Sequence, residues 1–135
     1  MAFSFSDWIA GGQLSDELQI GLYANVLDDS APLTWTMIQE CNFPGYARRR
    51  GDIWEPAVAR GEGGPAIRSR WVSWVAREPS ANSPARGLFV VALDQQGSIE
   101  LVAVRPFPSE ISFDAAGRRY GCRVYLHGFQ YTVSA

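Results

Sequence analysis

The feature that most constrains this chain is the shortness of its apolar runs and the regularity with which turn residues interrupt them. Residues 88–93 form a continuous apolar run, and Asp94-Gln95-Gln96-Gly97 follows it. A run of that length between turn signals is typical of a central strand buried on both faces, and the next four residues predict a hairpin turn. A returning strand is expected over residues 99–104. We expect Pro106 and Pro108 to end it, because proline cannot donate to a strand ladder.

Other segments have the same character. Residues 18–26 alternate apolar and polar side chains, which predicts a half-buried strand. Residues 67–76, rich in Val and Trp, predict another strand, and residues 120–133 predict a long final one. Pro44-Gly45 predicts a type II turn in which the glycine supplies the positive φ. Shorter strands are expected at residues 53–54 and 111–113, and a glycine-rich loop is expected at 60–65.

Strands at roughly ten-residue spacing with turns between them favour an antiparallel sandwich or barrel. A parallel βαβ arrangement needs helices of about ten or more residues between strands, and the sequence offers none. With 135 residues, the chain can bury a core without a disulfide or metal. The expected fold is therefore all-β: one domain over residues 1–135, forming an antiparallel, jelly-roll-like β-sandwich of about six to seven strands.

One short N-terminal helix is expected over residues 6–12, where Gly11-Gly12 ends it. A helix of this length is not stable alone and has to dock on the rest of the protein. Residues 1–14 are therefore interpreted as a docking segment, with Trp8 and Ile9 as its contacts. The start of the chain lacks the basic region of a secretory signal and soon turns acidic, so synthesis in the cytoplasm is expected.

The sequence has few of the residues that usually take part in catalysis or metal binding. The one histidine, His127, falls in the last predicted strand, on the face of Arg123 and Tyr125 and opposite Cys122. Cys41 and Cys122 are interpreted as buried small hydrophobes, since two distant thiols and one histidine do not make a standard zinc site. No phosphate-binding loop is recognisable. We therefore expect no catalytic residue, metal or cofactor.

Two regions are candidates for contact with a partner protein. In the strand over 67–76, strict alternation places Arg68, Arg70 and Trp74 on one face and Trp71 on the other, so neither face is cleanly apolar. Large apolar groups on both faces indicate a central strand or one covered by a partner. All the basic residues are arginine, which suits interfaces, although a GC-rich genome also favours arginine codons.

The second region is the run Arg48, Arg49 and Arg50. One interpretation is contact with an acidic patch on a partner, and the other is a solvated loop. Nucleic acid is not expected as a partner, because the net charge is about −2 and exposed aromatic residues are not interleaved with the arginines. A membrane is not expected either, since no apolar run approaches about 18 residues.

The chain also resembles a family of small structural proteins from tailed-phage particles. The motifs that carry this resemblance occur in the family's order: Gly11-Gly12, Ile20-Gly21-Leu22-Tyr23-Ala24-Asn25, residues 28–32, Glu40-Cys41-Asn42-Phe43-Pro44-Gly45-Tyr46, residues 88–97 and residues 101–108. The Arg48–Arg50 run and the Trp-rich strand depart from the family pattern. The resemblance implies a β-sandwich displayed on a capsid or tail, without catalytic residues.

These observations lead to three hypotheses. The first is a virion structural protein, a decoration or minor subunit that forms homo-oligomers and binds capsid or tail proteins in repeated copies. It would be made in the bacterial cytoplasm and located in the virion. The second is a carbohydrate- or receptor-binding module, because five tryptophans could provide sugar platforms. The third is a small enzyme on a β scaffold, which the lack of an acid–base or metal set disfavours.

Overall fold

The computed structural model describes residues 17–27, 32–55, 58–60, 64–79, 84–94, 96–127 and 130–134. At 58–60, 64–67, 127 and 130–134 it describes the backbone alone. The helix expected over residues 6–12, with Trp8 and Ile9, lies outside these ranges.

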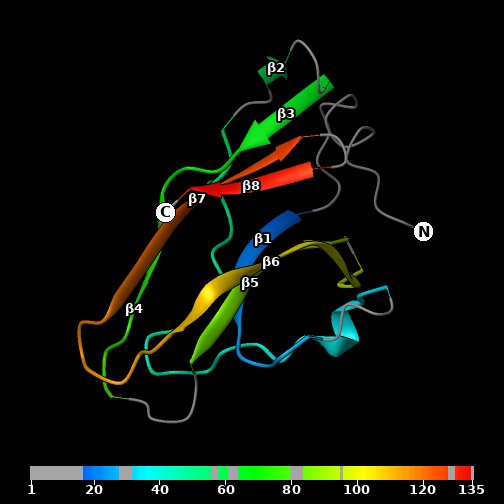
Figure 1. Ribbon diagram of the computed structural model, residues 1–135. Helices are drawn as coiled ribbons and strands as arrows, with labels where there is room; N and C mark the ends of the chain where they lie inside the picture. Colours follow the sequence, from blue (N-terminus) through cyan, green and yellow to red (C-terminus); the bar gives the residue numbers. More distant parts are fainter. Residues whose placement is uncertain are drawn as a thin grey trace.

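The described residues form two antiparallel sheets, so the all-β prediction is confirmed (Figure 1). The first sheet has the order β1-β5-β6, and the second has the order β2-β3-β7-β4 with β8 paired to β7. The strands are β1 Glu17–Tyr23, β2 Val58–Arg60, β3 Gly64–Arg68, β4 Val72–Val75, β5 Ala85–Leu93, β6 Ile99–Ile111, β7 Arg119–His127 and β8 Gln130–Ser134. One 3-10 turn, η1, spans Trp35–Met37.

The predicted number of six to seven strands is not confirmed, since the described part of the chain holds eight. The segment expected as one long final strand is two strands, β7 and β8, which pair with His127 opposite Gln130. The expected loop over 60–65 includes the end of β2 and the start of β3, which pair with Arg60 opposite Gly64.

In the first sheet, β5 is the central strand and is buried on both faces, as predicted. The turn after it is also confirmed: the Asp94 carboxylate accepts hydrogen bonds from the backbone N–H groups of Gln96 and Ser98, and Gly97 has a φ of 86°. The prediction of a half-buried β1 is wrong. Residues on both of its faces are buried, because other segments cover the face that was expected to meet solvent.

The prediction that Pro106 and Pro108 end the sixth strand is also wrong, because β6 continues through both to Ile111. Its described partner is β5 alone, so β6 is an edge strand, where a missing N–H donor is tolerated. The ladder is also irregular at this point, with a register shift between Ala85 and Gly87.

A bulge interrupts the second sheet between β3 and β4. Both strands pair with β7, one after the other (green beside orange-brown in Figure 1). Arg68 lies opposite Tyr125 and Val72 lies opposite Cys122, so three residues on one strand face two on the other. The extra residue breaks the alternation, which is the defining property of a β-bulge. Ser69 and Val72 consequently both lie buried.

Buried side chains from both sheets form one main cluster. Its members include Leu18, Ile20, Leu22, Leu88, Val90 and Ala92 from the first sheet, and Val72, Trp74, Cys122, Val124 and Leu126 from the second. Phe43 and Phe113 stack within the cluster with ring centroids 4.0 Å apart. A smaller cluster of Tyr23, Phe89 and Val91 is covered by residues that include Trp35 and Ile38.

The bulge generates a prediction about Ser69, whose fully buried Oγ accepts a hydrogen bond of 2.9 Å from the Val124 N–H. Ser69→Ala leaves that buried donor without its acceptor, so the free energy of unfolding should fall by about 1–3 kcal/mol. Urea denaturation measures the change. Ser73→Ala, on the neighbouring strand and only half-buried, is the matched control and should stay within about 0.5 kcal/mol of the parent. Equal losses from both variants would contradict the assigned role of Ser69.

Candidate binding site

The segment of residues 40–54, here called the crossing segment, connects the two sheets. It pairs with the free edge of β1 through Tyr23 opposite Glu40 and Ile20 opposite Arg49. It then reaches the second sheet, where Trp54 pairs with Ser69. The Trp54 indole N–H also donates to the Leu18 carbonyl at 2.9 Å, so one side chain connects the segment back to the first sheet.

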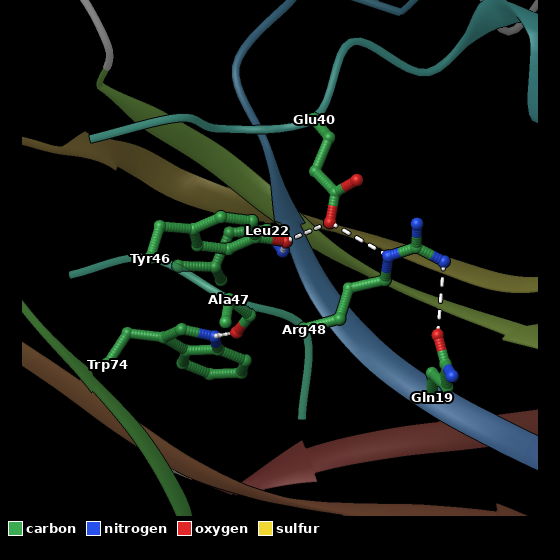
Figure 2. Close-up of polar contacts among 7 residues, drawn as sticks. All are labelled: Gln19, Leu22, Glu40, Tyr46, Ala47, Arg48 and Trp74. Carbon is green, nitrogen blue, oxygen red and sulfur yellow. Dashed lines mark hydrogen bonds and ion pairs between the residues drawn. The ribbon is translucent and has the colours of Figure 1, made fainter. Parts of the chain in front are cut away.

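A small polar network fixes the crossing segment on β1 (Figure 2). One carboxylate oxygen of Glu40 accepts a hydrogen bond from the Tyr46 hydroxyl at 2.5 Å and lies 3.0 Å from Nε of Arg48. Figure 2 shows the phenol and the guanidinium converging on that carboxylate. The Tyr46 oxygen also accepts the Leu22 N–H at 3.2 Å, and Arg48 donates to the buried amide of Gln19 at 3.1 Å.

The arginine run 48–50 is therefore not a uniformly solvated loop. Arg48 is held by Glu40 and lies over the Trp35 ring, with 5.4 Å between its guanidinium carbon and the ring centroid. Arg49 donates to the Ser73 carbonyl at 2.8 Å and lies over the Trp74 ring at 5.8 Å. Arg50 is exposed. Two of these three candidate interface residues thus stabilise the protein's own fold.

The Phe-Pro-Gly-Tyr motif has a structural role in this chain. Gly45 has a φ of 97°, as the type II turn prediction requires, and a Cβ there would lie 2.5 Å from the Val75 carbonyl oxygen. Phe43 enters the core, and Tyr46 joins the polar network. Burial, with the hydrogen bond to Glu40 next in importance, raises the pKa of Tyr46 well above its usual 10. The phenol of the folded protein therefore stays protonated at pH 10, where a free tyrosine is half ionised.

The two tryptophans of the strand run lie on opposite sides, as alternation predicted, and the bulge places Trp71 on the exposed side with Arg68 and Arg70. Trp74 is fully buried, and its indole N–H donates to the Ala47 carbonyl at 2.9 Å (Figure 2). Its burial removes it from the candidate interface. Trp71 is 57% exposed, and its ring lies over Gly121 of β7, where an added Cβ would meet it at 2.6 Å. Arg68 and Arg70 are also exposed.

Together these residues define a surface on the second sheet, which we call the arginine–tryptophan face. It consists of Arg68, Arg70, Trp71, Arg119 and Arg123. On β7, the buried residues Cys122, Val124 and Leu126 alternate with outward-directed ones, so Arg119, Gly121 and Arg123 share the outer side. The structure thus brings together arginines from two strands that are about 50 positions apart in the sequence.

The carboxylate of Glu55 lies among the arginines of this face. Glu55, which directly follows the crossing segment, accepts a short hydrogen bond from Nε of Arg68. That bond lowers the pKa of Glu55 against the opposing effect of desolvation, and the nearby charges of Arg68, Arg123 and Arg70 lower it further. The three guanidinium groups therefore lie close enough to act on one carboxylate.

Arg119, Arg123 and Glu55 were not among the interface residues predicted from the sequence. The available signal was the alternation around Cys122, which placed Arg123 on the non-core face of β7. The sequence did not show that β7 pairs with β3 and β4. This pairing brings Arg123 close to Glu55 and Trp71.

The remaining candidates for catalysis or metal binding are few in the described ranges. No group of three or more His, Cys, Asp or Glu residues there could hold a metal ion. Cys41 and Cys122 are buried, as predicted, and form no disulfide, and burial raises the pKa of Cys122 to about 12. His127 ends β7, and its side chain lies outside the described part. Nor do the described residues include a helix with the length and apolarity needed to cross a membrane.

Comparisons with protein-family models, with curated proteins and with solved structures find no match to this chain.

The polar network predicts different roles for two adjacent arginines. Arg48→Gln removes a charge-assisted contact to the partly buried Glu40 and one to Gln19, and it should lower the free energy of unfolding by about 1–2 kcal/mol. Arg50→Gln is the control of equal charge change at an exposed position and should cost less than about 0.5 kcal/mol. Chemical denaturation of both variants at one ionic strength tests this. A larger loss in the free energy of unfolding from Arg50→Gln than from Arg48→Gln would contradict the assigned polar network.

One buried thiol and two partly buried phenols predict a loss of stability at high pH. The pKa values of Tyr46 and Tyr120 lie above the usual 10, mainly through burial, and that of Cys122 rises from 9.0 to about 12. Because the folded state holds these protons more tightly, their contribution is constant below about pH 9 and falls as the pH rises through 9–12. Denaturation at pH 8–11 should show this fall, with a shallower slope in Tyr46→Phe.

Tyrosinate absorbance at 295 nm provides an independent measurement. Of the five tyrosines, Tyr46 and Tyr120 should ionise only as the protein unfolds. Reversible ionisation of all five near pH 10 in the folded protein would contradict the burial that the structure assigns to these two phenols.

Proposed function

We propose that this chain is a structural subunit of a tailed-phage particle, which acts by binding and has no catalytic step. In this proposal its two sheets form a β-sandwich, present in repeated copies, that docks on capsid or tail proteins. The arginine–tryptophan face is the docking surface, and Arg119 and Arg123 are added to the predicted interface residues. Nucleic acid and membrane are not partners in this proposal.

The observation that supports a binding role is the exposure of Trp71 within a group of arginines. Trp and Arg are among the residues most enriched at interaction hot spots, and here an exposed indole lies beside several arginines. The sandwich is supported by the main cluster, to which both sheets contribute. The virion setting is supported by the order of the sequence motifs that resemble the phage family.

A carbohydrate- or receptor-binding module is the second candidate, and the same residue favours it. The Trp71 ring lies over Gly121, and a broad aromatic surface of this kind could stack against a sugar ring. The surrounding arginines favour the first candidate, because they add charges that a neutral sugar does not use.

The proposal predicts that the chain is a stoichiometric component of purified particles. Quantitative mass spectrometry of density-purified particles should find it at a fixed copy number relative to the major capsid or tail protein. Particles assembled with Trp71→Ser should contain at least tenfold less of the chain, because the central apolar contact is lost. Arg105→Gln, an exposed arginine on β6 of the other sheet, is the control and should leave the copy number unchanged.

Absence of the parent chain from such particles would refute the virion assignment. Binding of the parent chain, but not of Trp71→Ser, to a glycan array would favour the carbohydrate candidate instead.

A further inference from the structure

The outer side of β7 presents two cations separated by an indole. Arg119, Gly121 and Arg123 alternate outward, and Trp71 occupies the space above the glycine. The absence of a side chain at Gly121 is what allows this, because a Cβ there would lie 2.6–2.8 Å from three atoms of the indole. Since a strand rises about 3.3 Å per residue, the two arginines are roughly 13 Å apart along β7.

The charge of this face is opposite to that of the rest of the chain. The arginine–tryptophan face holds four arginines. Among the described residues of the second sheet, and residues 53–55 beside that sheet, Glu55 is the one acidic residue. That gives three net positive charges, so the remainder of a chain of net charge −2 carries about five negative ones. A face with this local charge favours a negatively charged partner by complementarity.

The structure also indicates which negatively charged group suits this face. Glu55 already binds Arg68 through a carboxylate oxygen, so the surface accommodates a carboxylate in its own fold. Nε of Arg123 is buried, so pairing with a partner has to use the terminal NH2 groups of the guanidinium. A carboxylate is the acceptor that pairs with a guanidinium most strongly.

We propose that the arginine–tryptophan face binds an extended acidic segment of a partner protein, in which an apolar residue lies between two carboxylates. The carboxylates pair with Arg119 and Arg123, and the apolar side chain packs on Trp71. An extended segment with the pattern acid-x-apolar-x-acid has the required spacing, because alternate side chains of an extended chain point the same way and its residues also rise by about 3.3 Å. This inference rests on the proposed binding function and specifies its partner.

Phosphate-bearing polymers fit the face less well than carboxylates. Trp71 is the one exposed aromatic residue described on the face, whereas stacking on a single-stranded nucleic acid uses successive aromatic residues. The acidic remainder of the chain would also repel a long polyanion, while a short segment confined to this face avoids that repulsion.

Indole N–H signals in two-dimensional ¹⁵N NMR test the proposal on the purified full-length chain. The sequence has five tryptophans, and the signal missing from Trp71→Phe identifies Trp71. The probe is the peptide acetyl-Ser-Glu-Ser-Leu-Ser-Glu-Ser-amide. We expect it to shift the Trp71 signal in a saturable way and to leave that of buried Trp74, held by the Ala47 carbonyl, unmoved.

Two control ligands test the specificity. A peptide of the same composition with adjacent glutamates, acetyl-Ser-Ser-Leu-Ser-Glu-Glu-Ser-amide, should bind at least threefold more weakly. A short oligothymidylate should bind more weakly than the acid-x-apolar-x-acid peptide. Equal affinity for the two peptides, or tighter binding of the oligonucleotide, would overturn the proposal in favour of general anion binding.

Variants assign the contacts. Arg119→Gln combined with Arg123→Gln should weaken peptide binding about tenfold, as expected for two partly exposed charge pairs. Arg105→Gln, with the same chemical change on the other sheet, should leave it unchanged. An unaltered spectrum of buried indoles shows that each variant is folded. If the double variant bound as tightly as Arg105→Gln, the assigned contacts would be wrong.

Failure here is distinguishable from failure of the virion assignment. If the peptide does not bind, but Trp71→Ser still depletes the chain from particles, the binding role stands and the acidic segment is refuted. If the peptide binds as expected and the chain is absent from particles, the surface stands and the virion setting is refuted.

Discussion

The extra residue between β3 and β4 decides which side chains of the second sheet reach the core and which reach solvent. Before the bulge Ser69 points inward, and after it Val72 and Trp74 do. Without the insertion, the residues after it would change faces, because the side-chain period of a strand is two. Bulges leave backbone groups unpaired, and here the Ser69 hydroxyl accepts the N–H of Val124 at that point. A single buried hydroxyl therefore supports both the core position of Trp74 and the exposed position of Trp71.

The arginines divide into two groups according to what surrounds them. Arg48 and Arg49 lie over indole rings and donate to acceptors within the fold, so their charges are used to hold the crossing segment between the sheets. The arginines of the second sheet have one carboxylate, Glu55, for several guanidinium groups. Planar guanidinium groups that stack and form several directed hydrogen bonds suit both roles, whereas a lysine ammonium would stack poorly. The lack of lysine in the sequence is consistent with either role and does not separate them.

The parts of the fold that depend on local signals were predictable. The central strand β5, the turn ending at Gly97 and the turn at Gly45 follow from short-range apolar runs and from glycine's tolerance of positive φ. The errors came from long-range pairing. Prolines would end a central strand, but β6 accepts them because it lies at an edge. Strand β1 is buried on both faces because distant residues such as Trp35 cover its outer side. The strict alternation assumed for residues 67–76 failed at the bulge, which no local motif announces.

The same long-range pairing explains why the candidate site was only partly predicted. Arg68, Arg70 and Trp71 were found because they follow one another in the sequence, whereas Arg119, Arg123 and Glu55 join them through the pairing of β7 and the crossing segment with β3 and β4. Arg48, Arg49 and Trp74 were included because charge and size alone do not distinguish a residue that binds a partner from one that binds its own fold. The difference lies in how many internal acceptors serve the arginines. Arg48 has Glu40 and Arg49 has the Ser73 carbonyl, whereas the charges of Arg68, Arg70 and Arg123 all act on the one carboxylate of Glu55. The outer side of the second sheet therefore keeps an excess of positive charge that a negatively charged partner complements.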